Sequence, residues 1–186
     1  MPKSRPPPPS PWVVRFAPLI ARGGPVLDLA CGGGRHARYL RGRGHPVVAV
    51  DVELAGVADL AGQEGVELVA ADLERSAPWP LAGRRFACVV VANYLWRPLF
   101  PDILGAVDDG GVLIYETFAA GNEAYGKPAR PDFLLSPGEL LSVVGTPFRI
   151  VAYEHGYVDR PRPAVVQRLC AVRAAEPRPI HPEDPP

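Results

Sequence analysis

The sequence predicts an α/β fold: a doubly wound, mostly parallel sheet of seven strands with an antiparallel final strand. Short apolar runs of the kind found in doubly buried strands recur along the chain. Most of them are separated by helical segments, which implies right-handed crossovers and helices on both faces of the sheet. The last two runs are joined instead by a short, turn-rich connection, which allows an antiparallel pair.

The first half of the chain alternates helices and strands. The first helix should begin at Pro11 with Ser10 as its N-cap, and Pro18 should end or kink it. Glycine and proline then separate several of the later elements. In this half we expect strands over 26–30, 47–51 and 66–71, and helices over 35–43 and 53–64.

The second half contains one long, irregular connection. We expect strands over 86–92, 112–117, 148–154 and 165–173, and helices over 98–107 and 136–144. Residues 118–135 show no sustained hydrophobic period. Because a connection of this length inside a compact domain is more often functional than idle, we expect it to be a lid over the site.

Length and composition limit the class of protein. A chain of 186 residues with 47% hydrophobic content can form one sizeable core, so we expect a single domain over 11–175. The proline-rich tails over 1–10 and 176–186 should be disordered. Lys plus Arg equals Asp plus Glu at 20 each, which makes nucleic acid an unexpected partner.

The cysteines and the hydropathy of the sequence indicate the cellular compartment. Cys31, Cys88 and Cys170 fit neither a disulfide framework nor a metal site. The N-terminus lacks the apolar core of a secretory signal, and no run approaches the ~20 apolar residues that span a bilayer. We therefore expect a cytoplasmic protein without a metal or a membrane partner. The sequence leaves the oligomeric state open.

The stretch VLDLACGGGRHARYL, residues 26–40, carries the strongest functional signal. The glycines from Gly32 to Gly34 lack Cβ atoms, so the backbone can turn there and a ligand can approach it closely. The pattern G-x-G-x-x-A, with Asp51 19 residues after Gly32, is typical of dinucleotide binding. Asp28 would repel a pyrophosphate, however, and would attract a sulfonium or an ammonium group. Asp28 therefore favours S-adenosylmethionine over a nicotinamide cofactor.

This stretch resembles motif I of the class I S-adenosylmethionine-dependent methyltransferases, with Ala30 where that family often has its first glycine. VVAVD, residues 47–51, resembles the next motif, and AADLE, residues 70–74, resembles the segment after the third strand. The resemblance implies a Rossmann-like methyltransferase fold with S-adenosylmethionine as the cofactor. It implies that Asp51 binds the ribose hydroxyls, Asp72 the adenine amino group and the Leu73 amide a ring nitrogen. The full set of cofactor-binding residues it implies is Asp28, Ala30, Gly32, Gly34, Asp51, Val52, Asp72, Leu73 and Asn93.

Two further segments resemble one bacterial group of small methyltransferases, akin to tellurite-resistance methyltransferases. They are GRHARYL, residues 34–40, and GKPARPDFLLSPGEL, residues 126–140. The expected reaction is methyl transfer by in-line displacement to a small molecule or a metalloid oxyanion. The alternatives are an RNA methyltransferase of the same fold, a nicotinamide-dependent oxidoreductase, and a non-catalytic cofactor-binding or interaction protein.

Tyr94 and Glu116 are the candidate catalytic residues, because they follow the fourth strand and end the fifth. A soft anion of sulfur, selenium or tellurium needs little activation, whereas an oxygen or nitrogen acceptor that loses a proton needs a base nearby. The sequence at Asn93 is ANYLW and not the Asn-Pro-Pro-Tyr type of signature, which disfavours methylation of an amino group on a flipped base.

Overall fold

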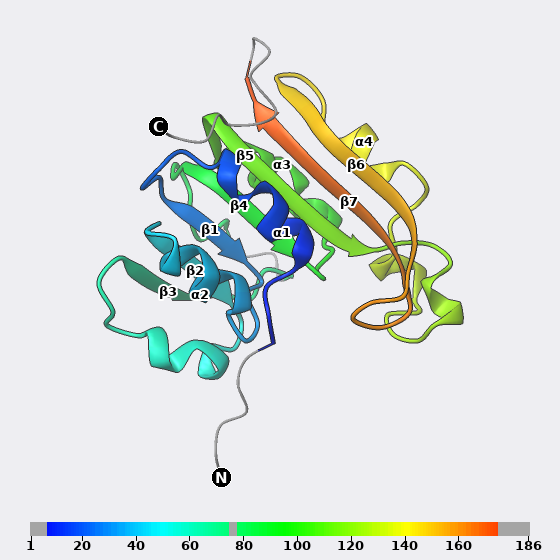
Figure 1. Cartoon of the computed structure of the whole chain (residues 1–186), viewed down its shortest axis with the longest axis horizontal. Coiled ribbons are helices and arrows are strands. Elements are labelled where there is room, and N and C mark those ends of the chain that lie inside the picture. The colour runs from blue at the N-terminus through cyan, green and yellow to red at the C-terminus, as the bar shows by residue number, and fades with distance from the viewer. Residues whose placement is uncertain (1–6, 75–77, 175–186) are drawn as a thin grey trace.

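One seven-stranded sheet runs through the molecule in the order β3-β2-β1-β4-β5-β7-β6 (Figure 1). The computed structural model describes residues 7–74 and 78–174. Strands β1 to β5 pair in parallel, and β7 pairs antiparallel with both β5 and β6. The predicted fold class is confirmed, including the antiparallel final strand.

The elements occur in the predicted order. The strands are β1 Val26–Leu29, β2 Val47–Asp51, β3 Val66–Ala70, β4 Phe86–Ala92, β5 Val107–Phe118, β6 Phe148–Val158 and β7 Ala164–Arg173. The α-helices are α1 Pro11–Phe16, α2 Arg35–Gly42, α3 Phe100–Ala106 and α4 Glu139–Val143. The 3₁₀ turns are η1 Ala17–Leu19, η2 Ala55–Leu60, η3 Arg97–Leu99, η4 Asn122–Ala124 and η5 Pro131–Phe133. The bounds of β2 and β4 match the prediction.

The helix predicted over 53–64 is wrong. The structure has the short 3₁₀ turn η2 there instead. Its two buried residues, Val57 and Leu60, are three positions apart, which is the repeat of a 3₁₀ helix. Gly56 packs so closely on the glycine loop that an added Cβ would lie 3.0 Å from the Gly32 carbonyl oxygen. A tight tertiary contact thus fixes this segment.

Strands β5 and β6 are longer than predicted. The predicted β5, 112–117, lacked the residues from Val107, which pairs with Phe86 beyond an irregularity in the β4–β5 ladder. The predicted β6, 148–154, lacked the residues up to Val158, which pairs with Ala164 of β7. Strand pairing extends both elements: the added part of β5 pairs with β4, and the added part of β6 pairs with β7 across a short connection.

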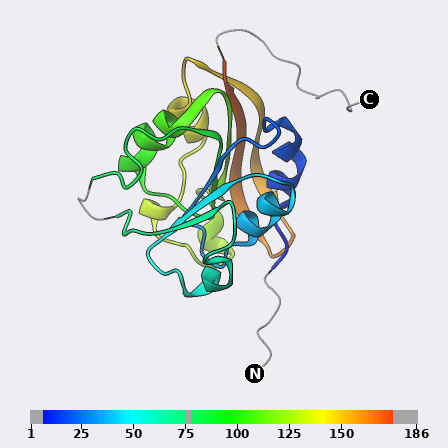
Figure 2. The same ribbon diagram turned by 90° about the vertical axis from the view of Figure 1, so that its left-hand side faces the viewer.

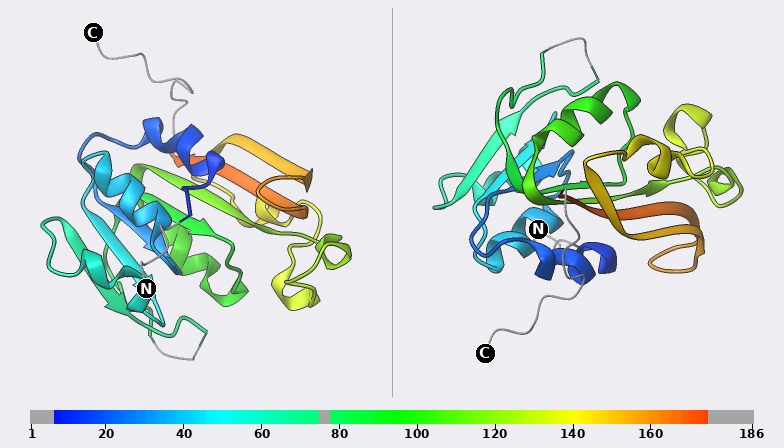
Figure 3. Two further views of the ribbon diagram at one scale, coloured as in Figure 1. Left: turned by 60° about the horizontal axis from the view of Figure 1, so that its bottom comes forward. Right: turned by 90° about the horizontal axis from the view of Figure 1, so that it is seen from above.

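Each face of the sheet has its own core, with α1 and α2 over one face and α3 and α4 over the other (Figures 2 and 3). The residues of β4 alternate between the two faces. Cys88 and Val90 belong to the core under α1 and α2, and Val89 and Val91 belong to the core under α3 and α4. Helices on both faces explain why these strands read as continuous apolar runs.

Ser10 belongs to the folded domain, although the prediction placed it in a disordered tail. It is buried, and its hydroxyl accepts a hydrogen bond from the Trp12 amide at 3.1 Å. This contact confirms the predicted N-cap. Residues 1–6 and 176–186 of the predicted tails lie outside the described residues. No helix in the described ranges combines the length and the apolar character needed to cross a membrane.

The predicted lid segment is tied to its neighbours at both ends. The Asn122 side chain donates to the Pro128 carbonyl at 2.8 Å and accepts from the Val165 amide at 3.1 Å. The Arg97 guanidinium donates to both carboxylate oxygens of Glu139 and to the carbonyls of Asp132 and Leu134, at distances of 2.7 to 2.9 Å.

We expect Arg97→Ala to loosen residues 131–139, because this one side chain links η5 to the start of α4. The loss of charge-assisted bonds to a partly exposed group should cost about 1–2 kcal/mol of stability. Hydrogen–deuterium exchange should show faster exchange in this segment. The control is Arg22→Ala at an exposed position. Equal exchange in the two variants would show that Arg97 does not hold the segment.

Candidate functional site

The candidate site lies where the strand order reverses. From β1 the chain moves outward through β2 to β3, and then returns to β4 on the other side of β1. In parallel α/β sheets the carboxyl ends of the strands at this point form a ligand-binding crevice. Two cavities lie at these strand ends, one of about 400 Å³ (the first cavity) and one of about 710 Å³ (the second cavity).

The loop after β1 has a backbone that favours small residues. Ala30, Gly32 and Gly34 have positive φ angles of 51°, 52° and 68°. A Cβ on Gly34 would collide with Val57 of η2. Ala30 is not a glycine, so its conformation is strained, and such strain is concentrated at ligand sites.

Asp51 connects the end of β2 to this loop. Its Oδ2 accepts a hydrogen bond from the Gly32 amide at 2.7 Å, and its Oδ1 accepts one from the Glu53 amide at 3.1 Å. Asp51 also lines the first cavity. A carboxylate has about four lone-pair sites, so it can hold the loop and still accept hydrogen bonds from a ligand.

The first cavity brings together five of the predicted cofactor-binding residues. Its lining consists of Ala30, Asp51, Val52, Ala71, Asp72, Leu73, Glu74 and Tyr94. The sequence analysis did not assign Ala71 or Glu74 to the site, although both flank the predicted pair Asp72 and Leu73. Gly32 and Gly34 shape the loop beside the cavity and are not part of its lining.

Tyr94 also lines the first cavity, and its hydroxyl lacks a partner. The oxygen is buried and makes no hydrogen bond within the described residues. Burial, followed by the negative charges of Glu74 and Asp72, raises the pKa of the phenol. The phenol therefore stays protonated near neutral pH, where it is a hydrogen-bond donor. Its place in the cavity keeps Tyr94 a candidate site residue.

Asp28 lies behind the glycine loop and lines neither cavity. Its side chain is 1% exposed, and Oδ2 accepts a hydrogen bond from the Ala37 amide at 2.8 Å. Side chains alternate along a strand, so Asp28 points to the same side as Val26, where α2 packs. The structure therefore gives this carboxylate a contact that anchors the first turn of α2.

Asp28 and His36 are buried close to each other, and both have shifted pKa values. Burial raises the pKa of Asp28 to about 7, although the Ala37 amide and the charge of Arg35 lower it. Burial and the charge of Arg35 lower the pKa of His36 to about 3. The His36 Nδ1 lies 3.9 Å from Asp28 Oδ1, and its Nε2 accepts a hydrogen bond from the Ser10 amide at 3.2 Å. His36 is therefore neutral and links α2 to the N-terminal segment.

We expect these two groups to oppose each other in the pH dependence of stability. The raised pKa of Asp28 contributes stability that is present below pH 3.8 and is lost as the pH rises to about 7. The lowered pKa of His36 contributes stability that is present above pH 6.5 and is lost as the pH falls to about 3. Between these limits the two contributions have opposite slopes.

Asp28→Asn should therefore lose stability as the pH falls from 6.5 to 4.5, because only the His36 contribution remains. His36→Gln should gain stability over the same range, because only Asp28 remains. Denaturant unfolding at pH 6.5, 5.5 and 4.5 measures both slopes, and the parent protein should lie between the variants. Slopes of the same sign in both variants would contradict the assigned protonation states.

The second cavity holds Asn93 and Glu116, which the sequence analysis had assigned to the cofactor and to catalysis. The Asn93 amide donates to the Glu116 carbonyl at 2.9 Å, so the ends of β4 and β5 are joined. Asn93 has a φ angle of 58°, a second strained residue at a strand end. Asn93 lines the second cavity and its neighbour Tyr94 lines the first, so the two cavities adjoin at the end of β4.

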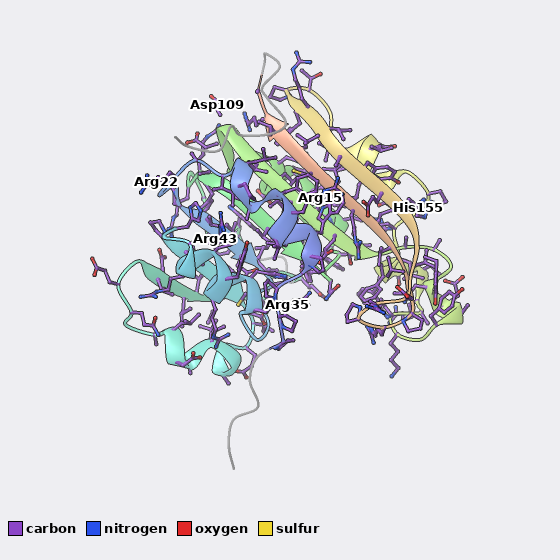
Figure 4. All side chains as sticks on the ribbon, in the orientation of Figure 1. Arg15, Arg22, Arg35, Arg43, Asp109 and His155 are labelled. Carbon is purple, nitrogen blue, oxygen red and sulfur yellow. The ribbon has the colours of Figure 1, made fainter. Side chains whose placement is uncertain are left out.

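The remaining lining of the second cavity comes from segments far apart in the chain. These are Pro7–Pro11, Arg35 at the start of α2, the ends of β5 and β6, the connection between β6 and β7, and the first half of β7. Figure 4 shows Arg35 at the end of α2 that faces the incoming N-terminal segment. Of the predicted lid, residues 118–135, Phe118 lines the second cavity, and residues 119–135 line neither cavity.

Arg168 is a site residue that the sequence analysis missed. On β7 it pairs with Glu116 of β5 and with Glu154 of β6. Its Nε lies 3.4 Å from Glu116 Oε2, yet this nitrogen is buried and makes no hydrogen bond within the described residues. Only the strand register reveals this pair, and the sequence does not show that register.

The comparisons with known proteins agree with this geometry. The family profile described as "Methyltransferase domain" matches residues 26–110, from β1 into β5. The match covers slightly less than half of the chain. The matched range includes the glycine loop and every residue that lines the first cavity.

Solved structures show the same fold over most of this chain. TehB from Haemophilus influenzae has a TM-score of 0.71 at 17% identity, over 87% of this chain and 61% of that one. The 1,6-didemethyltoxoflavin-N1-methyltransferase of Burkholderia thailandensis, with S-adenosylhomocysteine bound, has a TM-score of 0.68 at 22% identity, over 88% and 77%. An S-adenosylmethionine-dependent methyltransferase from Mesorhizobium loti has a TM-score of 0.65 at 19% identity, over 85% and 95%.

These similarities establish the fold and not the acceptor. The chain spans about three fifths of the length of TehB. No curated protein sequence matches the chain significantly.

Proposed function

We propose that this protein transfers a methyl group from S-adenosylmethionine to a small-molecule acceptor. The observation that carries the proposal is the pair of adjoining cavities at the strand switch point. One is lined by the acids and the loop expected for a nucleoside, and the other has room for a second reactant. Two reactants held side by side meet the main requirement of a displacement reaction, which is alignment.

The residues of the first cavity suit S-adenosylmethionine. Asp51 offers a carboxylate to a vicinal diol, and Asp72 offers one to an exocyclic amine. The unpartnered Tyr94 hydroxyl needs an acceptor, which a bound nucleoside can supply. The strained backbone at Ala30 brings the chain close to the ligand without a bulky side chain. We assign cofactor binding to Ala30, Asp51, Val52, Asp72 and Leu73, with Gly32, Gly34 and Asp28 as supports of the loop.

The cofactor supplies a methyl group on a positively charged sulfur. The protein contributes binding, orientation and exclusion of water. Asp51 accepts a hydrogen bond from the Gly32 amide of the glycine loop and one from the Glu53 amide after β2, so both segments are preorganised before a ligand arrives. Asn93 holds the junction between the cavities, where donor and acceptor would meet.

Glu116 is the proposed proton acceptor for a nitrogen or oxygen nucleophile. It lines the second cavity and is tied by its backbone to Asn93. The Nε atom of Arg168 lies 3.4 Å from Glu116 Oε2, so a positively charged group stands beside this carboxylate. A soft anionic acceptor would not need this residue. We expect the reaction to take place in the cytoplasm, because Cys31, Cys88 and Cys170 are free and buried.

Titration calorimetry with S-adenosylmethionine and with NAD tests the cofactor. S-adenosylmethionine should bind and NAD should not. Binding of NAD alone would favour an oxidoreductase and overturn the proposal. Transfer of labelled methyl into a fractionated cell extract then identifies the acceptor, and treating the extract with ribonuclease separates RNA from small molecules. A cofactor that binds but never loses its label would indicate a non-catalytic protein.

A further inference from the structure

The second cavity is basic although the chain as a whole is neutral. Its charged lining residues are four arginines and one glutamate: Arg35, Arg160, Arg162, Arg168 and Glu116. The whole chain has 20 basic and 20 acidic residues. The positive charge is therefore local, and a concave surface concentrates it further.

The four arginines differ in how far they are already paired. Arg168 lies beside Glu116 and also 3.5 Å from Glu154. Arg162 donates to the Lys127 carbonyl at 3.3 Å and lies over the ring of Phe118. Within residues 7–74 and 78–174, the side chains of Arg35 and Arg160 make no hydrogen bond or ion pair, although the charge of Arg35 acts on Asp28 and His36. These two guanidinium groups are therefore available to an anion, which each could bind through two parallel hydrogen bonds.

Between the arginines the walls of the cavity are apolar. The apolar lining residues are Pro7, Pro8, Pro9, Pro11, Phe118, Val158, Pro161, Ala164 and Val166. A volume of about 710 Å³ is in the range of sites for small organic ligands. It is far larger than an inorganic oxyanion needs, and such an ion would leave the apolar walls without contacts.

We propose that the second cavity is the acceptor site and that the acceptor is a small organic anion, an inference that rests on the proposed methyl transfer. Its apolar body packs against Phe118, Val166 and the N-terminal prolines. Its carboxylate or phosphate binds Arg35 and Arg160. The atom to be methylated lies toward Asn93 and Glu116, beside the first cavity. Of the two acceptor classes expected from the sequence, the second cavity favours the organic molecule over the metalloid oxyanion.

Ligand-detected NMR titration tests this directly, without turnover. The protein is saturated with S-adenosylhomocysteine at low ionic strength and titrated with benzoate, phenyl phosphate, benzamide and sulfate. We expect benzoate or phenyl phosphate to bind at least about tenfold more tightly than benzamide and sulfate, because only the first two combine charge with an apolar body. The tighter of the two anions identifies the preferred headgroup. Added salt should weaken its binding.

A matched pair of variants locates the anion. Arg35 begins α2, and Arg43 follows its last turn and lines neither cavity (Figure 4). Arg35→Gln should weaken binding of the preferred anion about tenfold, and Arg43→Gln should leave it unchanged. Arg160→Gln provides a second test on an exposed residue outside α2, where loss of the fold is not expected.

The results of these titrations distinguish a failure of the anionic acceptor site from a failure of the proposed methyl transfer. Failure of S-adenosylhomocysteine to bind would overturn both. Tight binding of S-adenosylhomocysteine with equal affinity for benzoate, phenyl phosphate and benzamide would overturn only the anionic acceptor. Equal losses in Arg35→Gln and Arg43→Gln, or binding of sulfate as tight as that of the organic anions, would also overturn it.

Discussion

Asp51→Ala should lower the affinity for S-adenosylmethionine by about 100-fold, the largest effect we expect on ligand binding. Two losses combine. The carboxylate no longer accepts hydrogen bonds from the ribose hydroxyls, and the amides of Gly32 in the glycine loop and Glu53 after β2 lose their acceptor. Hydrogen bonds to a charged group contribute about 1.5–3 kcal/mol each, and about 1.4 kcal/mol corresponds to a tenfold change in affinity.

Titration calorimetry measures this effect, with Glu64→Ala as the control. Glu64 is an exposed acid between η2 and β3 and lines neither cavity. Both variants remove one negative charge, so a general electrostatic effect would appear in both. Asp51→Asn should bind with intermediate affinity, because one side-chain oxygen still accepts. A dissociation constant for Asp51→Ala within twofold of the parent value would remove Asp51 from the cofactor site.

Gly34→Ala should give the largest loss of stability, about 2–4 kcal/mol. Gly34 has a φ angle of 68°, and this left-handed conformation costs a residue with a Cβ about 1–2 kcal/mol. The new Cβ would also collide with Val57 and would lie 3.0 Å from Nη1 of Arg38. Arg38 cannot move away freely, because it donates to the carbonyls of Gly33 and Gly56 and to Asp59.

The matched control, Gly42→Ala, lies on the same helix. Nothing lies within 4 Å of a Cβ at Gly42, and its φ angle is not positive. Alanine is the better helix former by about 1 kcal/mol, so this variant should be as stable as the parent or more stable. Denaturant unfolding compares the two.

A double variant separates the two causes of the predicted loss at Gly34. Val57→Ala removes the atom that the new Cβ would strike, so Gly34→Ala with Val57→Ala should recover part of the stability lost by steric conflict, measured against Val57→Ala alone. The backbone strain should remain. If Gly34→Ala unfolds at the same denaturant concentration as Gly42→Ala, the close packing of η2 on the glycine loop is not what holds this turn.

The structure confirms predicted elements whose sequence signal lies within a few neighbouring residues. It differs from the prediction where contacts with residues distant in the sequence decide the local structure. Ser10 caps α1, and the apolar runs became strands, because hydrogen-bonding groups and hydrophobic periodicity act over a few residues. The helix expected over 53–64 did not form, because Val57 and Gly56 pack on the glycine loop. The sequence of residues 53–64 does not indicate that the glycine loop packs against this segment.

The sequence likewise predicts some residues of the candidate site, whereas others are found only from tertiary contacts. The sequence placed Asp51, Asp72 and Leu73 at strand ends, and the structure lines one cavity with them. The sequence does not show on which face of the sheet the side chain of Asp28 lies, because both faces of a buried strand carry apolar residues. The helix that covers the side chain of Asp28 is α2.

The sequence by itself determined the fold class, the glycine turn and the acids that follow β2 and β3, because residue type and short spacing encode them. Only the tertiary structure decided that Asn93 and Tyr94 divide between two cavities and that Arg35, Arg160, Arg162 and Arg168 meet in one of them. These residues come from different elements, and their proximity depends on strand order and register. Strand order and register are set by the packing of the whole sheet.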